Sequence, residues 1–103
     1  MTLKKITLVL SFAMTALIAL NAQAYDGSKY EKEAKITIDQ ARKIALKIYP
    51  GTIVEEELAH KHGGSGLSYS FDVRANHLTR EISVDAKTGK VLKNTPESEG
   101  DDD

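Results

Sequence analysis

Cysteine is absent from this chain of 103 residues. Disulfides and thiolate metal sites are therefore excluded, and so is the lipoprotein route of export, which needs a cysteine after an apolar leader. A small domain without such crosslinks must be held together by its apolar core alone. Because that core is small, the sequence leaves open a stabilising partner or a weak homodimer.

The chain also lacks an apolar run long enough to span a bilayer. The longest run, residues 6–20, has about 15 residues, whereas a membrane-spanning helix needs roughly 20. It follows two lysines and precedes the small-x-small triplet Ala22-Gln23-Ala24, an order typical of a secretory signal. We expect residues 1–24 to be a signal peptide cleaved after Ala24, which leaves a periplasmic or secreted protein with no stable membrane anchor.

Net charge is small, at −1, but it is unevenly distributed. Residues 35–94 hold ten basic and seven acidic side chains, whereas residues 95–103 hold five acidic and no basic ones. A core so mildly basic, without interleaved aromatic residues, argues against nucleic-acid binding. Residues 95–103 contain nothing apolar to bury and are predicted to be a disordered acidic tail. Residues 25–35 are predicted to be a flexible N-terminal segment.

One capped amphipathic helix is predicted to open the folded part. Thr37 is a good N-cap, and Gln40 three residues later completes a capping box, so the helix should start at Ile38. Apolar residues then recur at helical spacing as far as Tyr49. Pro50-Gly51 ends the helix, because proline cannot continue the hydrogen-bond ladder and glycine tolerates a left-handed cap.

Alternating strands follow the helix. Residues 67–74 alternate apolar and polar side chains strictly, while residues 53–60 and 78–85 do so less regularly, and a short last strand is predicted at residues 90–93. Before that last strand Asp85 should bond turn amides, and Gly89 should take a positive φ. We therefore expect an α+β fold in which one helix packs on an antiparallel sheet of three to four strands.

The run Glu55-Glu56-Glu57 lies in the first of these strands. Consecutive strand residues alternate faces, so the three carboxylates cannot work as an acid–base pair on one bond. Charge on an edge strand instead discourages pairing with other copies. Glu56 is predicted to share the inward face with Val54 and Leu58, either because the strand bulges there, which we favour, or because a cation such as Lys43 lies nearby.

Four segments in this order resemble the PepSY domain family. They are the helix start Thr37-Ile-Asp-Gln-Ala-Arg-Lys-Ile-Ala, the stop Tyr49-Pro-Gly, the strand containing Tyr69, and Val84-Asp-Ala-Lys-Thr-Gly-Lys-Val-Leu92. PepSY domains occur in propeptides of thermolysin-like metallopeptidases and in small exported proteins. The resemblance implies a PepSY-like domain over residues 36–94 that binds another envelope or secreted protein and restrains a peptidase in trans. It brings no catalytic residues and no cofactor.

Nothing in the sequence forms a catalytic constellation, so the protein is predicted not to be an enzyme. Serines 65, 68, 70 and 83 have no plausible base around them, and the glycine-rich loop 63–66 lacks a Walker lysine. Two surfaces could bind a partner. One is a sheet edge, at residues 53–60 or 90–93. The other is the polar sheet face that a single helix leaves uncovered, bearing Ser68, Ser70, Asp72, Thr79, Glu81 and Ser83.

The alternative to protein binding is metal handling or a redox-accessory role. His60 and His62 lie two apart, a spacing that would put both rings on one side of a strand. His77 should lie at the opposite end of the intervening strand, roughly 26 Å away, so a third imidazole ligand is missing. Because a metal site needs more ligands than two histidines, we expect only weak metal binding.

Overall fold

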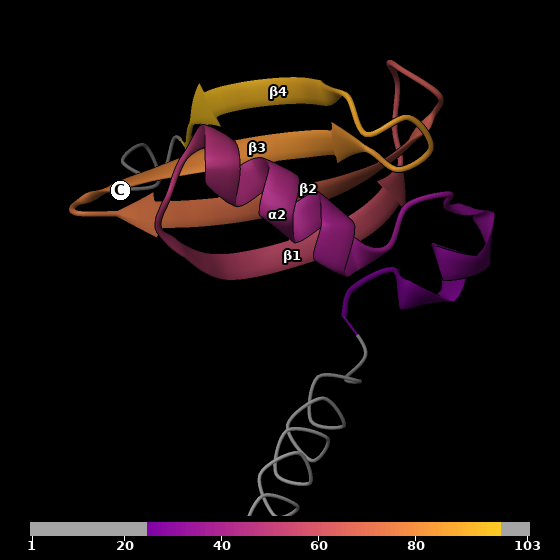
Figure 1. The fold of residues 1–103 in the computed structure, drawn as a ribbon, viewed down its shortest axis with the longest axis horizontal. Helices are drawn as coiled ribbons and strands as arrows, with labels where there is room; N and C mark the ends of the chain where they lie inside the picture. The colour runs from indigo at the N-terminus through magenta and orange to yellow at the C-terminus, as the bar shows by residue number, and fades with distance from the viewer. Residues whose placement is uncertain (1–24, 98–103) are drawn as a thin grey trace, which may run out of the picture.

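The computed structural model describes residues 25–97. A 3₁₀ helix η2 (Ser28–Glu33) and a helix α2 (Ile38–Ile48) precede the strands β1 (Thr52–His60), β2 (Leu67–Ala75), β3 (Leu78–Asp85) and β4 (Val91–Pro96). The strands form one antiparallel sheet in the order β1-β2-β3-β4, and α2 lies across one face of it (Figure 1). The predicted α+β architecture is confirmed.

Helix α2 begins and ends where local sequence dictates. The backbone N–H of Gln40 donates to Thr37 Oγ1 at 3.1 Å, and the N–H of Thr37 donates to Gln40 Oε1 at 2.9 Å, which completes the capping box. The helix buries Ile38, Ala41 and Ala45 against the sheet. Because alanines carry only a methyl group, the helix axis can approach the strands closely.

The core lies between α2 and the inward side chains of β1, β2 and β3. Tyr69 and Phe71 on β2 are buried and stack with ring centroids 6.3 Å apart. Leu58, Ile82 and Val84 complete the layer on the neighbouring strands. The strict alternation along β2 is thus confirmed, and the buried Tyr69 hydroxyl is satisfied because it donates to a backbone carbonyl at 2.8 Å.

Strand β1 contains a bulge at Val54 and not at Glu56, where it was predicted. The register with β2 shifts between Ile53 and Glu55, so Ile53 packs on the core and Val54 is 51% exposed. The prediction that Val54 shares the inward face with Leu58 is therefore wrong. Glu56 does lie on the helix side, where Arg42 Nε donates to its Oε1 at 2.9 Å, so the cation is Arg42 and not Lys43.

Residues 25–35, expected to be a flexible segment, instead contain η2 and contact the sheet. Tyr25 and Tyr30 pack against the core, and the N–H of Leu58 donates to the Asp26 carbonyl at 2.8 Å. Asp26 forms a parallel bridge with Glu57. Two tyrosine rings that pack on the core and a backbone hydrogen bond to the edge of β1 hold this segment in place.

Strand β4 is longer than predicted. It runs to Pro96, and the N–H of Glu97 donates to the Thr79 carbonyl at 2.8 Å, so residues 95–97 belong to the sheet and not to a disordered tail. Pairing with β3 uses backbone groups and needs no apolar side chain, which is why composition misjudged it. The rest of the expected tail and the expected signal peptide lie outside the described residues. Within residues 25–97 no helix has the length and apolarity to cross a membrane.

Asp85 forms the predicted turn and ties a second loop to it. Its Oδ1 accepts the N–H groups of Lys87 at 2.8 Å and Thr88 at 3.0 Å, and Gly89 has φ 81°. The N–H of Ser65 donates to Oδ2 at 2.6 Å, and its hydroxyl donates to Oδ1 at 2.8 Å. Burial acts to raise the pKa of Asp85, but these donors outweigh it and lower the pKa to about 2.

Candidate functional site

The sheet face opposite α2 carries all six residues predicted to bind a partner. They alternate along β2 and β3, and the register places Asp72 opposite Glu81 on β3 and Glu55 on β1. We call this surface the polar face. Its predicted members are Ser68, Ser70, Asp72, Thr79, Glu81 and Ser83, and β1 adds Glu55 and Glu57.

Four of the six predicted residues are less accessible than a solvated face implies. Ser68, Ser70, Thr79 and Ser83 are only 4–7% exposed, because short side chains lie between the longer ones of neighbouring strands. The Ser70 and Ser83 hydroxyls are 3.2 Å apart and hydrogen-bonded. These four hydroxyl side chains therefore lie at the base of the polar face, and we call them the hydroxyl floor. A partner would first contact the charged side chains around them.

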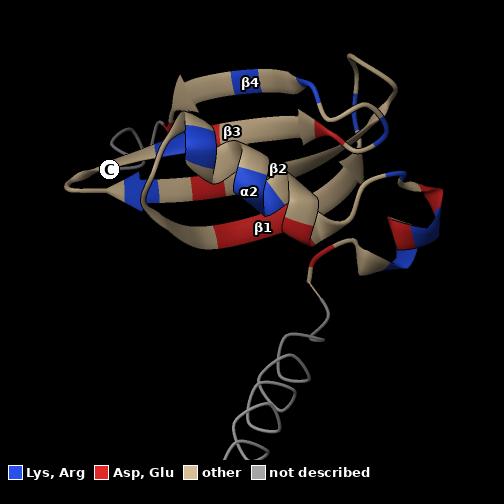
Figure 2. Ribbon diagram, viewed as in Figure 1, with Lys and Arg blue, Asp and Glu red and all other residues tan. Residues whose placement is uncertain are grey.

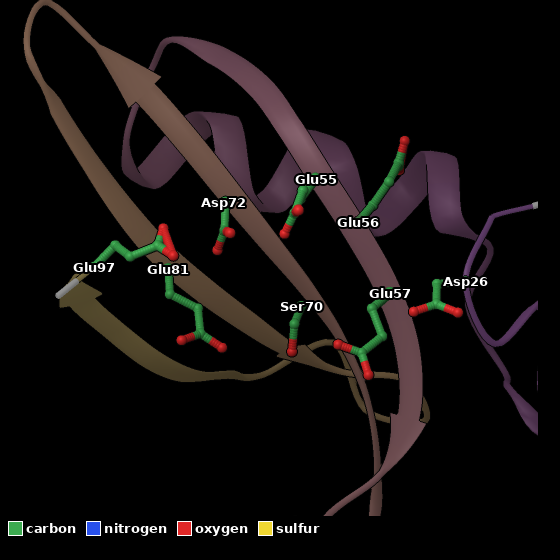
Figure 3. A pocket seen from close by; sticks show the side chains of 8 residues that line it. All are labelled: Asp26, Glu55, Glu56, Glu57, Ser70, Asp72, Glu81 and Glu97. Atoms are coloured by element: carbon green, nitrogen blue, oxygen red, sulfur yellow. The ribbon is translucent and has the colours of Figure 1, made fainter. Parts of the chain in front are cut away.

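Those charged side chains form an acidic cleft of about 370 Å³. Figure 3 shows Glu55, Glu57 and Asp72 on the same side of the sheet, while Glu56 extends the other way, toward the helix. We call this hollow the acidic cleft; its lining is Asp26, Glu55, Glu56, Glu57, Ser70, Asp72, Glu81 and Glu97. Of these, the sequence had indicated Ser70, Asp72 and Glu81 as site residues.

The other carboxylates were missed for two reasons. Glu55 and Glu57 lie two apart on a strand and so share a face, and that alternation was the available signal for placing them beside Asp72. Asp26 and Glu97 come from segments read as flexible or disordered, and only the pairing of these segments with β1 and β3 brings them to the cleft.

Asp72 lies among these carboxylates and its pKa is raised to about 7. Burial is the largest cause, followed by repulsion from Glu97 and by a hydrogen bond and repulsion from Glu55. Protonated and ionised forms of Asp72 therefore coexist near neutral pH. A cation placed in the cleft would favour the ionised form and would be bound more tightly as pH rises through this range.

Few cations neutralise the cleft from within the described part of the chain. Over residues 25–97, the salt bridges to its lining are Arg42 to Glu56, and Lys93 Nζ to Glu81 Oε1 at 3.2 Å. The basic residues of α2 lie on the helix side of the sheet, away from the cleft, as Figure 2 shows. The cleft consequently presents a net negative surface.

A second hollow of about 300 Å³ adjoins the acidic cleft on the polar face and carries mixed charge. Lys61, His62 and Lys93 line it together with Glu81, which the two hollows share. The polar face is thus acidic toward β1 and less so toward the loop after β1.

The histidines do not form the pair that the metal-handling alternative needs. β1 ends at His60, so His62 lies in the following loop and not on the same strand. His60 Nε2 is 2.8 Å from Glu33 Oε1, and its ring meets that of Tyr30 edge-on with centroids 4.5 Å apart. No group of three or more His, Cys, Asp or Glu side chains between residues 25 and 97 is placed to hold a metal ion.

Comparison with known proteins identifies the family of the chain. The profile of the PepSY family, described as peptidase propeptide and YPEB domain, matches residues 35–95, more than half of the chain. The chain belongs to the PepSY family. PepSY domains are generally non-catalytic, propeptide-like modules. No curated protein and no solved structure matches the chain. The PepSY match begins after η2, so the segment that carries Asp26 precedes the family domain.

Proposed function

We propose that this PepSY protein is a non-enzymatic, exported binding module that docks its polar face on another envelope or secreted protein. The acidic cleft is the observation that supports this most directly. It gathers carboxylates from β1, β2, β3 and the segments at both ends of the domain onto the sheet face opposite α2. A surface of this charge attracts a basic partner surface and steers its approach.

The hydroxyl floor makes the polar face suitable for a specific contact. Ser70 and Ser83 are bonded to each other, and the strands beneath them are held by the packed core. A rigid floor lowers the entropy lost when a partner binds, since few groups have to be ordered. The hydroxyls of Ser65, Ser70 and Ser83 are engaged in hydrogen bonds within the fold, which supports a binding role over a catalytic one.

A peptidase is the class of partner that we favour. The family takes its description from peptidase propeptides, and propeptide-like modules act on the enzymes they accompany. In this proposal the protein restrains a peptidase in trans, with the polar face against a basic region of the enzyme. Export through a signal peptide at residues 1–24 is part of the same proposal, since it would bring the protein to secreted peptidases.

Site-specific photo-crosslinking in the cell envelope tests the proposal. A photoreactive residue at Glu55, exposed on the polar face, should capture a discrete partner that mass spectrometry identifies. The same residue at Lys47, exposed on α2, is the matched control and should not capture it. Equal capture from both positions, or from neither, would contradict docking through the polar face.

Purified variants extend the test to activity. If the captured partner is a peptidase, the mature protein should slow its hydrolysis of a peptide substrate. Ser70→Arg should abolish this effect, because a long side chain would rise from the floor and block contact. Lys47→Glu on the opposite side should retain it. Circular dichroism of both variants checks that the fold persists.

A further inference from the structure

The two edges of the sheet differ in how they are closed. At the β4 edge, Pro96 has no N–H to offer a new strand. Arg80 Nη2 donates to the Asn94 carbonyl at 3.1 Å and Arg80 Nε donates to Asn94 Oδ1 at 2.8 Å, so this residue is already engaged. The β4 edge is thus closed by its own residues, as exposed edges in natural proteins commonly are.

The β1 edge is closed by a separate segment. Asp26 bridges to Glu57 in parallel and accepts the N–H of Leu58 at 2.8 Å. Gly27 follows so closely that any side chain there would collide with the Leu58 carbonyl. The backbone of Asp26 therefore already pairs with β1, and the chain turns away at Gly27, whose φ is 84°, so this edge accepts a further segment. We call residues 25–33 the edge cover.

None of the residues of the edge cover is fully buried, although Tyr25 and Tyr30 pack partly buried against the core and the Asp26 carbonyl accepts one backbone hydrogen bond. η2 buries none of its residues, and the cover precedes the family domain. His60 contacts Glu33 and Tyr30 at the surface, and the Tyr25 hydroxyl donates to Glu31 within the cover itself at 3.1 Å. The fully buried core residues all lie outside the cover. Its release would uncover the part of the core under Tyr25 and Tyr30, but it would remove no residue of α2 or of the four strands.

One feature of the edge cover is electrostatically unfavourable. Asp26 lies beside Glu57, its bridge partner, and both line the acidic cleft. Like charges on directly paired residues destabilise the pairing, whereas opposite charges stabilise it. A lysine or arginine in the place of Asp26 would therefore turn a repulsion into an attraction, so a basic strand should compete well for this edge.

The geometry of strands fixes the pattern of such a partner. Alternate residues of an added strand point to the same face of the sheet. Those on the polar face would lie alongside Glu55 and Glu57 and within reach of the cleft around Asp72. Basic side chains at every second position would meet this row of carboxylates, while the residues between them would lie on the helix side, where Arg42 already neutralises Glu56.

We propose that the β1 edge is the docking site for an extended segment of the partner protein with basic residues at alternate positions, which displaces residues 25–27 from β1. This inference rests on the proposed function and names the edge and the partner chemistry. The edge cover then competes with the partner, so the apparent affinity is reduced by the fraction of molecules in which the edge is covered.

A reversible lock on the edge cover tests the inference in the full mature protein. Asp26→Cys with Glu57→Cys places two cysteines on bridged residues, and the chain has no other cysteine to interfere. The probe is a synthetic peptide of about nine residues, a typical strand length, that alternates lysine and threonine. The wild-type protein should bind it, and the reduced variant, which lacks Glu57 but keeps Glu55 and the cleft around Asp72, should bind it more weakly. The oxidised variant should bind it at least about tenfold more weakly than the reduced one, because the edge is then permanently covered.

Two comparisons decide the outcome. Equal affinity of the oxidised and reduced forms would overturn the inference, and so would equal affinity for a peptide of the same composition with its lysines in one block. Amide signals of β1 in nuclear magnetic resonance spectra, Leu58 above all, should shift only with the alternating peptide. In a second variant, Tyr30→Ala, the cover loses its contact with His60, so the alternating peptide should bind severalfold more tightly. Unchanged or weaker binding there would also overturn the inference.

These results are separable from those that test the proposed function. If the crosslinker at Glu55 captures a partner from the envelope but the lock changes nothing, the protein binds through the polar face and the edge inference alone is wrong. If the peptide binds at β1 but Glu55 and Lys47 capture no partner, the edge is competent and the proposed function is wrong.

Discussion

Two aspartates in this small domain have opposite electrostatic surroundings. Asp85 lies among N–H and O–H donors from two loops, which lower its pKa to about 2 in spite of burial. Asp72, on the neighbouring strand, lies partly buried among other carboxylates, and its pKa is raised to about 7. The comparison separates a carboxylate that holds the fold together from one that the fold keeps in an unfavourable position. Carboxylates whose surroundings disfavour ionisation, as those of Asp72 do, are typical of functional surfaces.

The largest expected effect comes from removing the stabilising carboxylate. Asp85→Ala should lower the free energy of unfolding by about 3 kcal/mol, because several partly buried N–H and O–H groups that donate to the Asp85 carboxylate would lose a charged acceptor. Urea denaturation measures this. Asp85→Asn, which keeps one acceptor oxygen, is the matched control and should lose less. Equal losses in the two variants would mean that charge and not hydrogen bonding dominates.

Acid should weaken the same cluster. The pKa of Asp85 in the folded protein is below its ordinary value of 3.8. The stability that Asp85 contributes is therefore fully present above pH 3.8 and is lost as pH falls from about 4 to about 2. A shift of this size corresponds to about 2 kcal/mol. Unfolding curves at stepwise lower pH should show this loss in the wild type and a smaller one in Asp85→Asn. Parallel curves would show that Asp85 is not the group that titrates.

The turn that presents amides to Asp85 can be disturbed without touching the carboxylate. Gly89 has φ 81°, a conformation that strains a β-branched side chain. Gly89→Val should therefore cost about 1–2 kcal/mol of stability. Gly89→Asn, which tolerates this region better, should cost less. An unchanged melting temperature for Gly89→Val would place the strained turn position elsewhere.

The smallest effect should have the opposite sign. Because the folded pKa of Asp72 is raised, its contribution to stability falls as pH rises from about 4 through about 7. Asp72→Asn should therefore raise the melting temperature at pH 8 and change it little at pH 4. Glu97→Gln should give a weaker effect of the same sign, since Glu97 is one cause of the raised pKa. A fall in melting temperature at pH 8 would contradict the comparison between the two aspartates.

Taken together, the two aspartates predict an optimum of stability near pH 4. Below about pH 4 Asp85 becomes protonated in the unfolded chain and then in the folded one, and above it Asp72 ionises in the unfolded chain and then, among like charges, in the folded one. A protein that exposes a strained acidic surface gives up stability for the ability to bind, and a basic partner that relieves the repulsion should restore it.

Sequence predicted best the features that depend on neighbours along the chain. Thr37 and Gln40 are three residues apart, so their reciprocal bonds could be read directly, as could the turn from Asp85 to Gly89 and the alternation that buries Tyr69 and Phe71. A bulge in β1 was predicted at Glu56, from an acidic residue at an inward position, but the bulge lies at Val54, and Glu56 is paired with Arg42 instead. The position of the bulge could not be predicted, because it depends on the register with β2.

The candidate site was harder to predict, because its members are distant in sequence. Ser65 and Asp85 are 20 residues apart, and nothing in either loop indicates that one binds the other. Asp26 and Glu97 enter the acidic cleft only through backbone pairing at β1 and β3, and backbone groups are the same in every residue. Composition therefore classified their segments as flexible or disordered.

The sequence by itself determined the helix with its caps, the alternating strands, the turn at Asp85 and the membership of the PepSY family, since all of these are encoded in local order and spacing. Tertiary structure alone decided that the serines form a floor, that carboxylates from five segments share one cleft and that residues 25–27 cover the β1 edge. The physical reason is that burial, like-charge repulsion and edge pairing are properties of neighbours in space, which the folded chain brings together from distant positions.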